Sequence, residues 1–152
     1  MNNCEICAIL ATHNEGRDIT LTETKKWRVV LDPNQRFLGK SFVTLLDHKS
    51  SLSELSSEEW KDFTQLSKNL ERAIKLTFQP NHFNWSCLMN IAASKNLPTH
   101  VHWHLHPRYN KSIQINDTAF TDTEWYPATS KTDHIVDDET LSKITAKIKK
   151  NL

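Results

Sequence analysis

Four histidines occupy alternate positions in the segment that runs from residue 100 to residue 106. In a β-strand, successive side chains point to opposite faces, so His100, His102, His104 and His106 share one face. An imidazole can act as nucleophile, base, acid or metal ligand near neutral pH, and its nitrogens need partners when they are buried. The pattern therefore indicates a functional face, with a solvent-exposed edge and a metal site as the alternatives.

A second pair of reactive side chains lies at the N-terminus. Cys4 and Cys7 form a Cys-x-x-Cys motif, which can supply half of a tetrahedral zinc site or act as a redox pair. A thioredoxin-like redox pair is expected beside a βαβ pattern, and no such pattern surrounds this motif. A zinc site would need two further ligands, which the later histidines would have to supply.

The composition limits the classes of protein to which the chain can belong. With 152 residues, one domain with one core is expected. Lysine and arginine number 19 and the acidic residues 18, so there is no general basic field for nucleic acid. No apolar run is long enough to cross a membrane, and no signal peptide is recognisable. The odd number of cysteines, three, argues against a secreted disulfide scaffold, so we expect a cytoplasmic protein.

The apolar pattern predicts a mostly antiparallel sheet of five strands. Alternating or β-rich runs cover residues 18–23, 26–31 and 41–46, and turn residues separate them. The fourth predicted strand covers residues 84–91, and the fifth is the histidine segment. Short links between the first three runs favour an antiparallel meander.

Two helices complete the predicted α+β fold. Ser56 and Glu59 form a capping-box signature, and apolar residues spaced by three and four continue to about Phe78. Asp137 or Asp138 would cap a last helix whose apolar residues recur at the same spacing. The long helix is expected to pack on the sheet.

These features together resemble the histidine triad, or HIT, superfamily. The segment His-Val-His-Trp-His-Leu-His is similar to its signature His-φ-His-φ-His-φ-φ, where φ is apolar. Other features precede it in the order usual for the family: Cys4, Cys7, Leu31-Asp32, His48 and Asn90. The resemblance covers about residues 4–109 and looks most like a bacterial and archaeal branch labelled diadenosine polyphosphate hydrolase-like. It implies one HIT-like domain over residues 1–152, with 110–152 as a C-terminal extension, and a homodimer.

The resemblance implies nucleotidyl transfer or hydrolysis at the α-phosphate of a dinucleoside polyphosphate or related nucleoside phosphate derivative. His102 would attack phosphorus and form a covalent nucleotidyl intermediate, which splits one hard displacement into two easier ones. His104 would place a protonated nitrogen near the phosphate or the leaving group. No metal is required at the phosphate. The other implied substrate contacts are Asp32 for the ribose hydroxyls, and Lys40, Asn90 and Asn96 for phosphate.

The resemblance also implies the two missing ligands of the N-terminal motif. His48 and His100 would complete a Cys₂His₂ set with Cys4 and Cys7. Such a zinc site is closed by four protein ligands and is structural. His100 is thus expected both in the triad and at the metal.

Two positions depart from the family pattern. Lys40 follows Gly39 where family members often have a histidine, and a lysine holds phosphate as a point charge but cannot exchange a proton near pH 7. His106 replaces the last apolar residue of the signature and adds a fourth imidazole. The glycine-rich loop before the triad is replaced by residues 92–98.

Other classes remain open at this point. A nucleotide-binding regulator would keep the pocket but turn over little, and a phosphoramidase-type HIT enzyme would cleave a different derivative. A histidine-rich metalloenzyme would bind a catalytic metal through His102, His104 and His106. A turnover assay and a metal analysis distinguish these classes.

Overall fold

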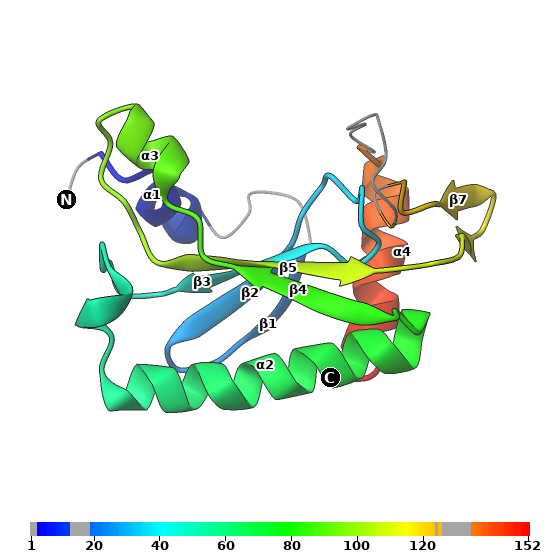
Figure 1. The fold of residues 1–152 in the computed structure, drawn as a ribbon, viewed down its shortest axis with the longest axis horizontal. Coiled ribbons are helices and arrows are strands. Elements are labelled where there is room, and N and C mark those ends of the chain that lie inside the picture. Colours follow the sequence, from blue (N-terminus) through cyan, green and yellow to red (C-terminus); the bar gives the residue numbers. More distant parts are fainter. Residues whose placement is uncertain (1–2, 13–18, 124, 126–134) are drawn as a thin grey trace.

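The computed structural model describes residues 3–12, 19–123, 125 and 135–152. Within these ranges the main sheet has five strands: β1 (Thr20–Glu23), β2 (Trp27–Leu31), β3 (Ser41–Leu45), β4 (His82–Ser86) and β5 (His102–Arg108). Each neighbouring pair is antiparallel, and the order is β1-β2-β3-β5-β4. The predicted α+β class and antiparallel sheet are confirmed. Strand β5, which carries the histidines, lies between β3 and β4 (Figure 1).

Helices cover both faces of this sheet. Helix α2 (Ser57–Phe78) runs along one face, and α1 (Glu5–Ala11) and α3 (Asn90–Ser94) lie beyond the opposite face (Figure 1). A short 3-10 turn at Leu52–Glu54 precedes α2. Helix α4 (Asp138–Lys149) packs against α2 and β1. The face opposite α2 is therefore the one on which a site can form under α1 and α3.

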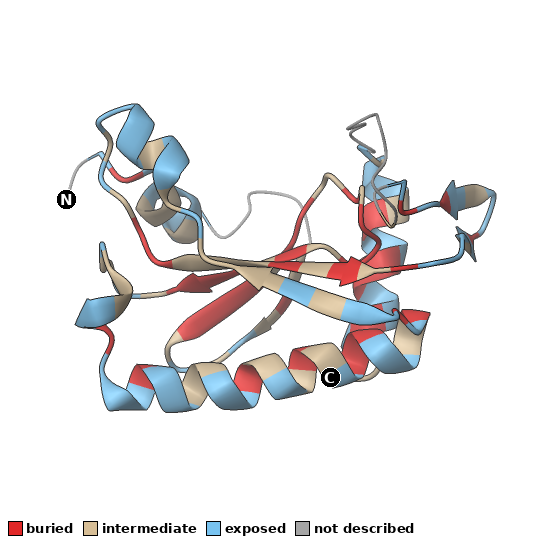
Figure 2. Cartoon of the chain, viewed as in Figure 1, coloured by how far each residue is buried: buried red, intermediate tan, exposed pale blue. Residues whose placement is uncertain are grey.

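The hydrophobic core lies between the sheet and α2. Trp27, Val29 and Leu31 alternate along β2 and are fully buried, as are Val101 and Leu105 around β5. Figure 2 shows the same division on α2, whose buried residues face the sheet while its outer side is exposed. The stripe predicted for this helix is confirmed for its buried apolar members: Leu66, Leu70, Ala73, Ile74 and Phe78.

Local hydrogen bonds set the ends of α2. The Glu59 backbone amide donates to Ser56 Oγ at 3.2 Å, and the Ser56 amide donates to Glu59 Oε2 at 2.6 Å. This reciprocal pair is the predicted capping box. The helix ends at Gln79, whose φ of 54° is left-handed and stops further helical hydrogen bonding.

The fourth predicted strand is wrong in its second half. Strand β4 ends at Ser86, and Asn90 begins helix α3 instead of lying in a strand. Leu88 and Ile91 are exposed, at 53% and 65%, and line a pocket. The apolar residues that suggested a buried strand therefore belong to a cavity wall.

The C-terminal extension adds a hairpin and a helix. Strands β6 (Ile113–Ile115) and β7 (Thr118–Phe120) pair with each other, and the sequence pattern did not predict them. The predicted last helix is confirmed as α4, with Asp137 as its cap. The first predicted strand began at residue 18, which lies outside the described residues. No described helix is long and apolar enough to cross a membrane.

Candidate functional site

The histidine row forms one side of β5, as its alternation predicted. His102 lies opposite Thr44 of β3, and His104 lies opposite Phe42. The ring centroids of His102 and His104 are 5.0 Å apart, and those of His104 and His106 are 6.1 Å apart. These three imidazoles are half-buried and therefore accessible to a ligand in part.

One hydrogen bond orients the ring of His102 and assigns its tautomer. Its Nδ1 lies 2.8 Å from the carbonyl oxygen of His100. Because a carbonyl oxygen only accepts, we assign the single ring proton of the neutral form to Nδ1, and in that form Nε2 has the lone pair. A neutral imidazole held in this way can act as a nucleophile through Nε2.

The next two imidazoles are held in the neutral form. Burial lowers the pKa of His104 to about 4, with further contributions from His102 and the positive charge of Lys40. Burial also lowers the pKa of His106 to about 4, followed by the charges of Lys40, His104 and Arg108. The ligand-free protein thus favours the neutral form of His104, and a protonated His104 beside bound phosphate stays a prediction. An anion beside it would favour the charged form and raise that pKa.

A pocket of about 380 Å³ lies over the histidine row, between α1 and α3. Its wall includes Asn90, His102 and His104. A second pocket of about 200 Å³ adjoins it, and Ile6, Phe42 and His102 line both. The second pocket is otherwise mostly apolar, with contributions from Ile9, Leu10, Val30, Thr44 and the buried Arg28.

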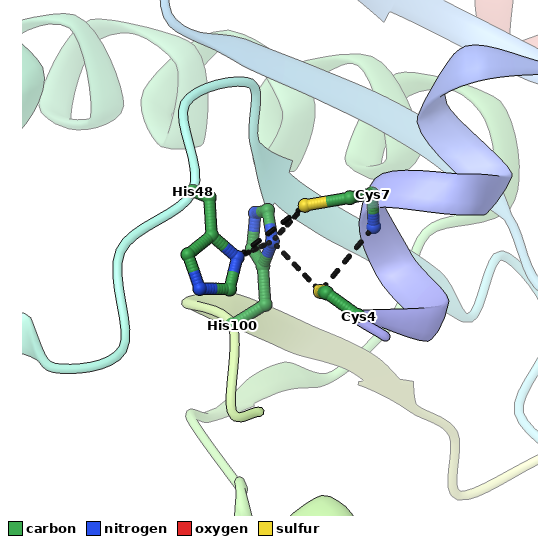
Figure 3. A group of neighbouring side chains, drawn as sticks. All are labelled: Cys4, Cys7, His48 and His100. Carbon is green, nitrogen blue, oxygen red and sulfur yellow. Dashed lines mark hydrogen bonds between the residues drawn. The ribbon is translucent and has the colours of Figure 1, made fainter. Parts of the chain in front are cut away.

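Cys4, Cys7, His48 and His100 form a compact cluster at the start of the histidine row. Figure 3 shows their side chains converging from α1, from the segment after β3 and from the segment before β5. All four potential ligand atoms lie within 4.8 Å of one another. The structure thus brings together the four residues that were expected to bind zinc.

Four of the distances between the ligand atoms match the edges of a tetrahedral metal site. The two Nδ1 atoms are 3.3 Å apart, and Cys7 Sγ lies 3.3 Å from His48 Nδ1 and 3.4 Å from His100 Nδ1. Cys4 Sγ lies 3.5 Å from His100 Nδ1. Zn–N bonds of about 2.0 Å and Zn–S bonds of about 2.3 Å give tetrahedral edges of roughly 3.3–3.8 Å. The donor set and its spacing therefore fit a zinc ion.

Burial prepares His100 as a ligand. Its Nε2 donates to the carbonyl oxygen of Leu45 at 2.8 Å, so Nδ1 carries the lone pair that faces the sulfurs. Burial lowers the pKa of His100, which keeps it neutral. Burial and the neighbouring Cys4 raise the pKa of the Cys7 thiol to about 11, so a metal would have to displace protons to bind.

Asp32 and Lys40 lie together where β2 ends and β3 begins. Lys40 Nζ is 2.7 Å from Asp32 Oδ2, and both side chains are largely buried. The other carboxylate oxygen, Oδ1, accepts from the Asn34 amide at 2.8 Å. The two pockets described above are lined by other residues. Sequence analysis did not predict this ion pair, because it assigned Asp32 to the ribose hydroxyls and Lys40 to a phosphate.

The two asparagines have different positions. Asn90 is exposed in the larger pocket. Asn96 follows α3 with a φ of 53°, and its backbone amide donates to Ala93. The larger pocket is lined by Asn90 but not by Asn96. Sequence reasoning also missed Ile6 and Phe42; pairing β3 with β5 would have placed Phe42 beside His104.

Comparison with known proteins agrees with this geometry. A scan against protein families matches residues 14–111 to the HIT domain. Among solved structures, a histidine triad nucleotide-binding protein from Sulfolobus tokodaii is 16% identical, with a TM-score of 0.71, covering 97% of this chain and 91% of that one. A HIT family member from Bacillus subtilis is 27% identical, with a TM-score of 0.60 and coverage of 99% and 98%. A zinc-bound histidine triad family protein from Mycobacterium smegmatis is 18% identical, with a TM-score of 0.63 and coverage of 95% and 92%. A search of curated proteins finds no match.

Proposed function

The chain belongs to the HIT domain family, and from that premise we propose that it acts at the α-phosphate of a dinucleoside polyphosphate or a related nucleoside phosphate derivative. It would hydrolyse or transfer the nucleotidyl group through a covalent intermediate on His102. The observation that carries this proposal is the 2.8 Å hydrogen bond from His102 Nδ1 to the His100 carbonyl. With Nδ1 held by that bond, Nε2 would be the nitrogen that attacks phosphorus.

The proposed reaction has two displacements. In the first, His102 Nε2 forms a bond to the α-phosphorus while the bond from phosphorus to the leaving oxygen breaks. His104 would take up a proton when the anionic substrate raises its pKa, and would give that proton to the leaving oxygen. In the second, water attacks the same phosphorus and gives a proton to His104, while His102 Nε2 leaves as the neutral imidazole.

Surrounding residues would hold the rest of the nucleotide. The mostly apolar pocket beside Phe42 suits a base, because its walls offer aliphatic and aromatic contact. Asp32 would accept the ribose hydroxyls, Lys40 would offset the charge of the carboxylate and phosphate, and Asn90 would donate to phosphate oxygens. Asn96 would also donate a hydrogen bond to a phosphate oxygen.

We propose that the Cys–His cluster holds a structural zinc ion. The donor set of two thiols and two imidazoles and its tetrahedral spacing support this assignment. Zinc supplies folding free energy at such a site by joining segments that are distant in sequence. The chain's own residues Cys4, Cys7, His48 and His100 would thereby fix α1 against β5.

A cytoplasmic homodimer remains the proposed form of the protein.

The test is turnover with α-labelled substrates. Purified protein would be assayed with diadenosine polyphosphates, adenosine phosphoramidates and mononucleotide esters. Enzyme quenched during turnover should carry an acid-labile label on the protein. A protein that binds these nucleotides but turns none of them over would be a regulator. Turnover that requires an added metal besides zinc would favour the metalloenzyme.

A further inference from the structure

The larger pocket has a wall that the proposed reaction does not use. His102 and His104 take part in that reaction, and Asn90 is assigned to the phosphate. Beyond these residues, the chain between β4 and β5 contributes an apolar wall to the pocket, made by Leu88, Met89, Ile91, Ala92, Leu97 and Pro98. A ligand that extends past the two histidines would therefore meet mainly hydrocarbon surface.

The apolar wall is held in place, yet part of it is open to solvent. The Leu97 amide donates to the carbonyl oxygen of Ala92 at 2.9 Å, and Met89 packs against the hydrophobic core. In contrast, the side chains of Leu88 and Ile91 are exposed. A ligand that covered them would remove apolar surface from water, which favours binding.

Positive charge is scarce along the apolar wall. Among the residues that the structure describes, no lysine and no arginine lines the larger pocket, whereas the acidic Glu5 does. Lys95, which follows α3, lies 4.0 Å from the Glu5 carboxylate, and Lys40 is bound to Asp32. Phosphates beyond the α-phosphate would add negative charge here, and desolvating a charge without a cationic partner costs binding free energy. The apolar wall is therefore poorly matched to a polyphosphate chain.

We propose that the leaving group of the substrate is an uncharged organic group, aliphatic or aromatic, that packs against the apolar wall. The substrate is then an ester of a nucleoside 5′-phosphate with an apolar alcohol or phenol. In the first displacement the bond between the α-phosphorus and the ester oxygen breaks, and that oxygen takes the proton from His104. This inference rests on the proposed function, because it keeps His102 as the nucleophile and narrows the class of leaving group.

The experiment measures ligand binding by calorimetry to the His102→Asn variant, which has no nucleophile and so consumes no ligand. Three ligands share one nucleoside: the methyl ester of AMP, the phenyl ester of AMP, and ATP without added magnesium. The two esters have the same charge and differ only in the group that would meet the apolar wall. We expect the phenyl ester to bind about tenfold more tightly than the methyl ester, because the ring buries apolar surface. ATP should bind no more tightly than the methyl ester.

A second substitution in the same background tests the apolar wall directly. Ile91→Lys places a cation on the wall at an exposed position, where the fold should tolerate it. It should weaken binding of the phenyl ester and strengthen binding of ATP, each by about fivefold. Leu88→Lys repeats the test from another position on the wall. Leu76→Lys is the matched control, because Leu76 is also an exposed apolar helical residue but does not line this pocket. Melting temperatures check that all variants fold.

Two results would overturn the inference alone. If the phenyl ester binds no more tightly than the methyl ester, the apolar wall does not receive the leaving group. If ATP binds more tightly than the methyl ester, the pocket accepts a polyphosphate chain. A wild-type protein that shows the expected binding order but hydrolyses neither ester would refute the proposed reaction and leave the binding preference standing. Failure of all three ligands to bind would refute both.

Discussion

His100 and His102 lie two residues apart on one face of one chain segment, yet they present opposite nitrogens. His100 donates its Nε2 proton to Leu45 and presents Nδ1 to the cysteines, whereas His102 donates its Nδ1 proton to His100 and keeps Nε2 for the pocket. The first histidine is buried in a closed cluster, and the second is half-buried beside two pockets.

The difference shows that a backbone carbonyl decides what each imidazole can do. Both side chains are the same, and both line the larger pocket. The accepting oxygen selects the tautomer, and the tautomer selects the free nitrogen. One row of histidines can therefore include both a metal ligand and a nucleophile without any change of residue type.

The largest expected effect is on turnover and comes from replacing His102, the histidine that lines both pockets. His102→Asn should reduce turnover by roughly 10³-fold or more, because the variant lacks the proposed nucleophile while its fold stays intact. Nucleotide binding, metal content and melting temperature should stay as in the wild type. Steady-state turnover with diadenosine polyphosphates measures the change.

His104→Ala is the companion variant. It should be slower by about 10²-fold or more with ordinary substrates and should recover with activated leaving groups, which need little protonation. If His102→Asn keeps near wild-type turnover, the assignment of the nucleophile is wrong.

The second effect is on metal content and stability and comes from changing the Cys–His cluster that contains His100. Cys4→Ser with Cys7→Ser should remove the single zinc that we expect per chain and lower the melting temperature, because the metal joins α1 to β5. Elemental analysis and thermal unfolding measure both. Cys87→Ser is the control, since Cys87 lies outside the cluster. A metal-free wild type of equal stability would contradict the zinc assignment.

A smaller effect concerns the nucleoside end. Asp32→Ala should raise KM for ribonucleotides about tenfold and change KM for 2′,3′-dideoxy analogues much less, because the carboxylate can only bind hydroxyls that are present. Lys40→Met breaks the same ion pair but keeps the carboxylate, so it separates loss of the pair from loss of the acceptor. Equal losses with both substrate classes would remove Asp32 from the ribose site.

The smallest effect is the pH dependence of folding. The pKa values of His104 and His106 fall from 6.5 to about 4 in the native protein, so between these values the unfolded chain binds more protons. The unfolding free energy should therefore be highest above pH 6.5 and decrease toward pH 4, by on the order of 1 kcal/mol for each partly exposed imidazole. Denaturant titrations at several pH values measure it. His106→Leu should show a shallower decrease, and an unchanged slope would contradict the lowered pKa.

Long periodic elements could be predicted from the sequence. The capping box of Ser56 and Glu59 and the stripe that follows them span a 22-residue helix, in which many positions repeat one signal. The strict alternation of the histidines likewise predicts that their side chains share one face. These features are local, so the sequence contains the information directly.

Short elements and distant pairs could not be predicted in the same way. Helices α1 and α3 have 7 and 5 residues, too few for a helical period to show. Such helices are held by tertiary contacts and not by their own propensity. The pairing of Asp32 with Lys40 depends on how the loop between them closes, which no periodicity reports. The cysteines and histidines of the cluster were grouped by family resemblance, because up to 96 residues separate them.

Helix α1 has a consequence for how two ligands influence each other. Cys7 points to the cluster, while Ile6, Ile9 and Leu10 of the same seven-residue helix form a wall of the apolar pocket. A metal ion that fixes this helix reduces the conformational freedom that a pocket ligand would otherwise have to restrict. By linkage, the pocket ligand must strengthen metal binding by the same factor. With zinc bound at the cluster, the protein would respond to its metal supply through its affinity for the molecule that occupies that pocket.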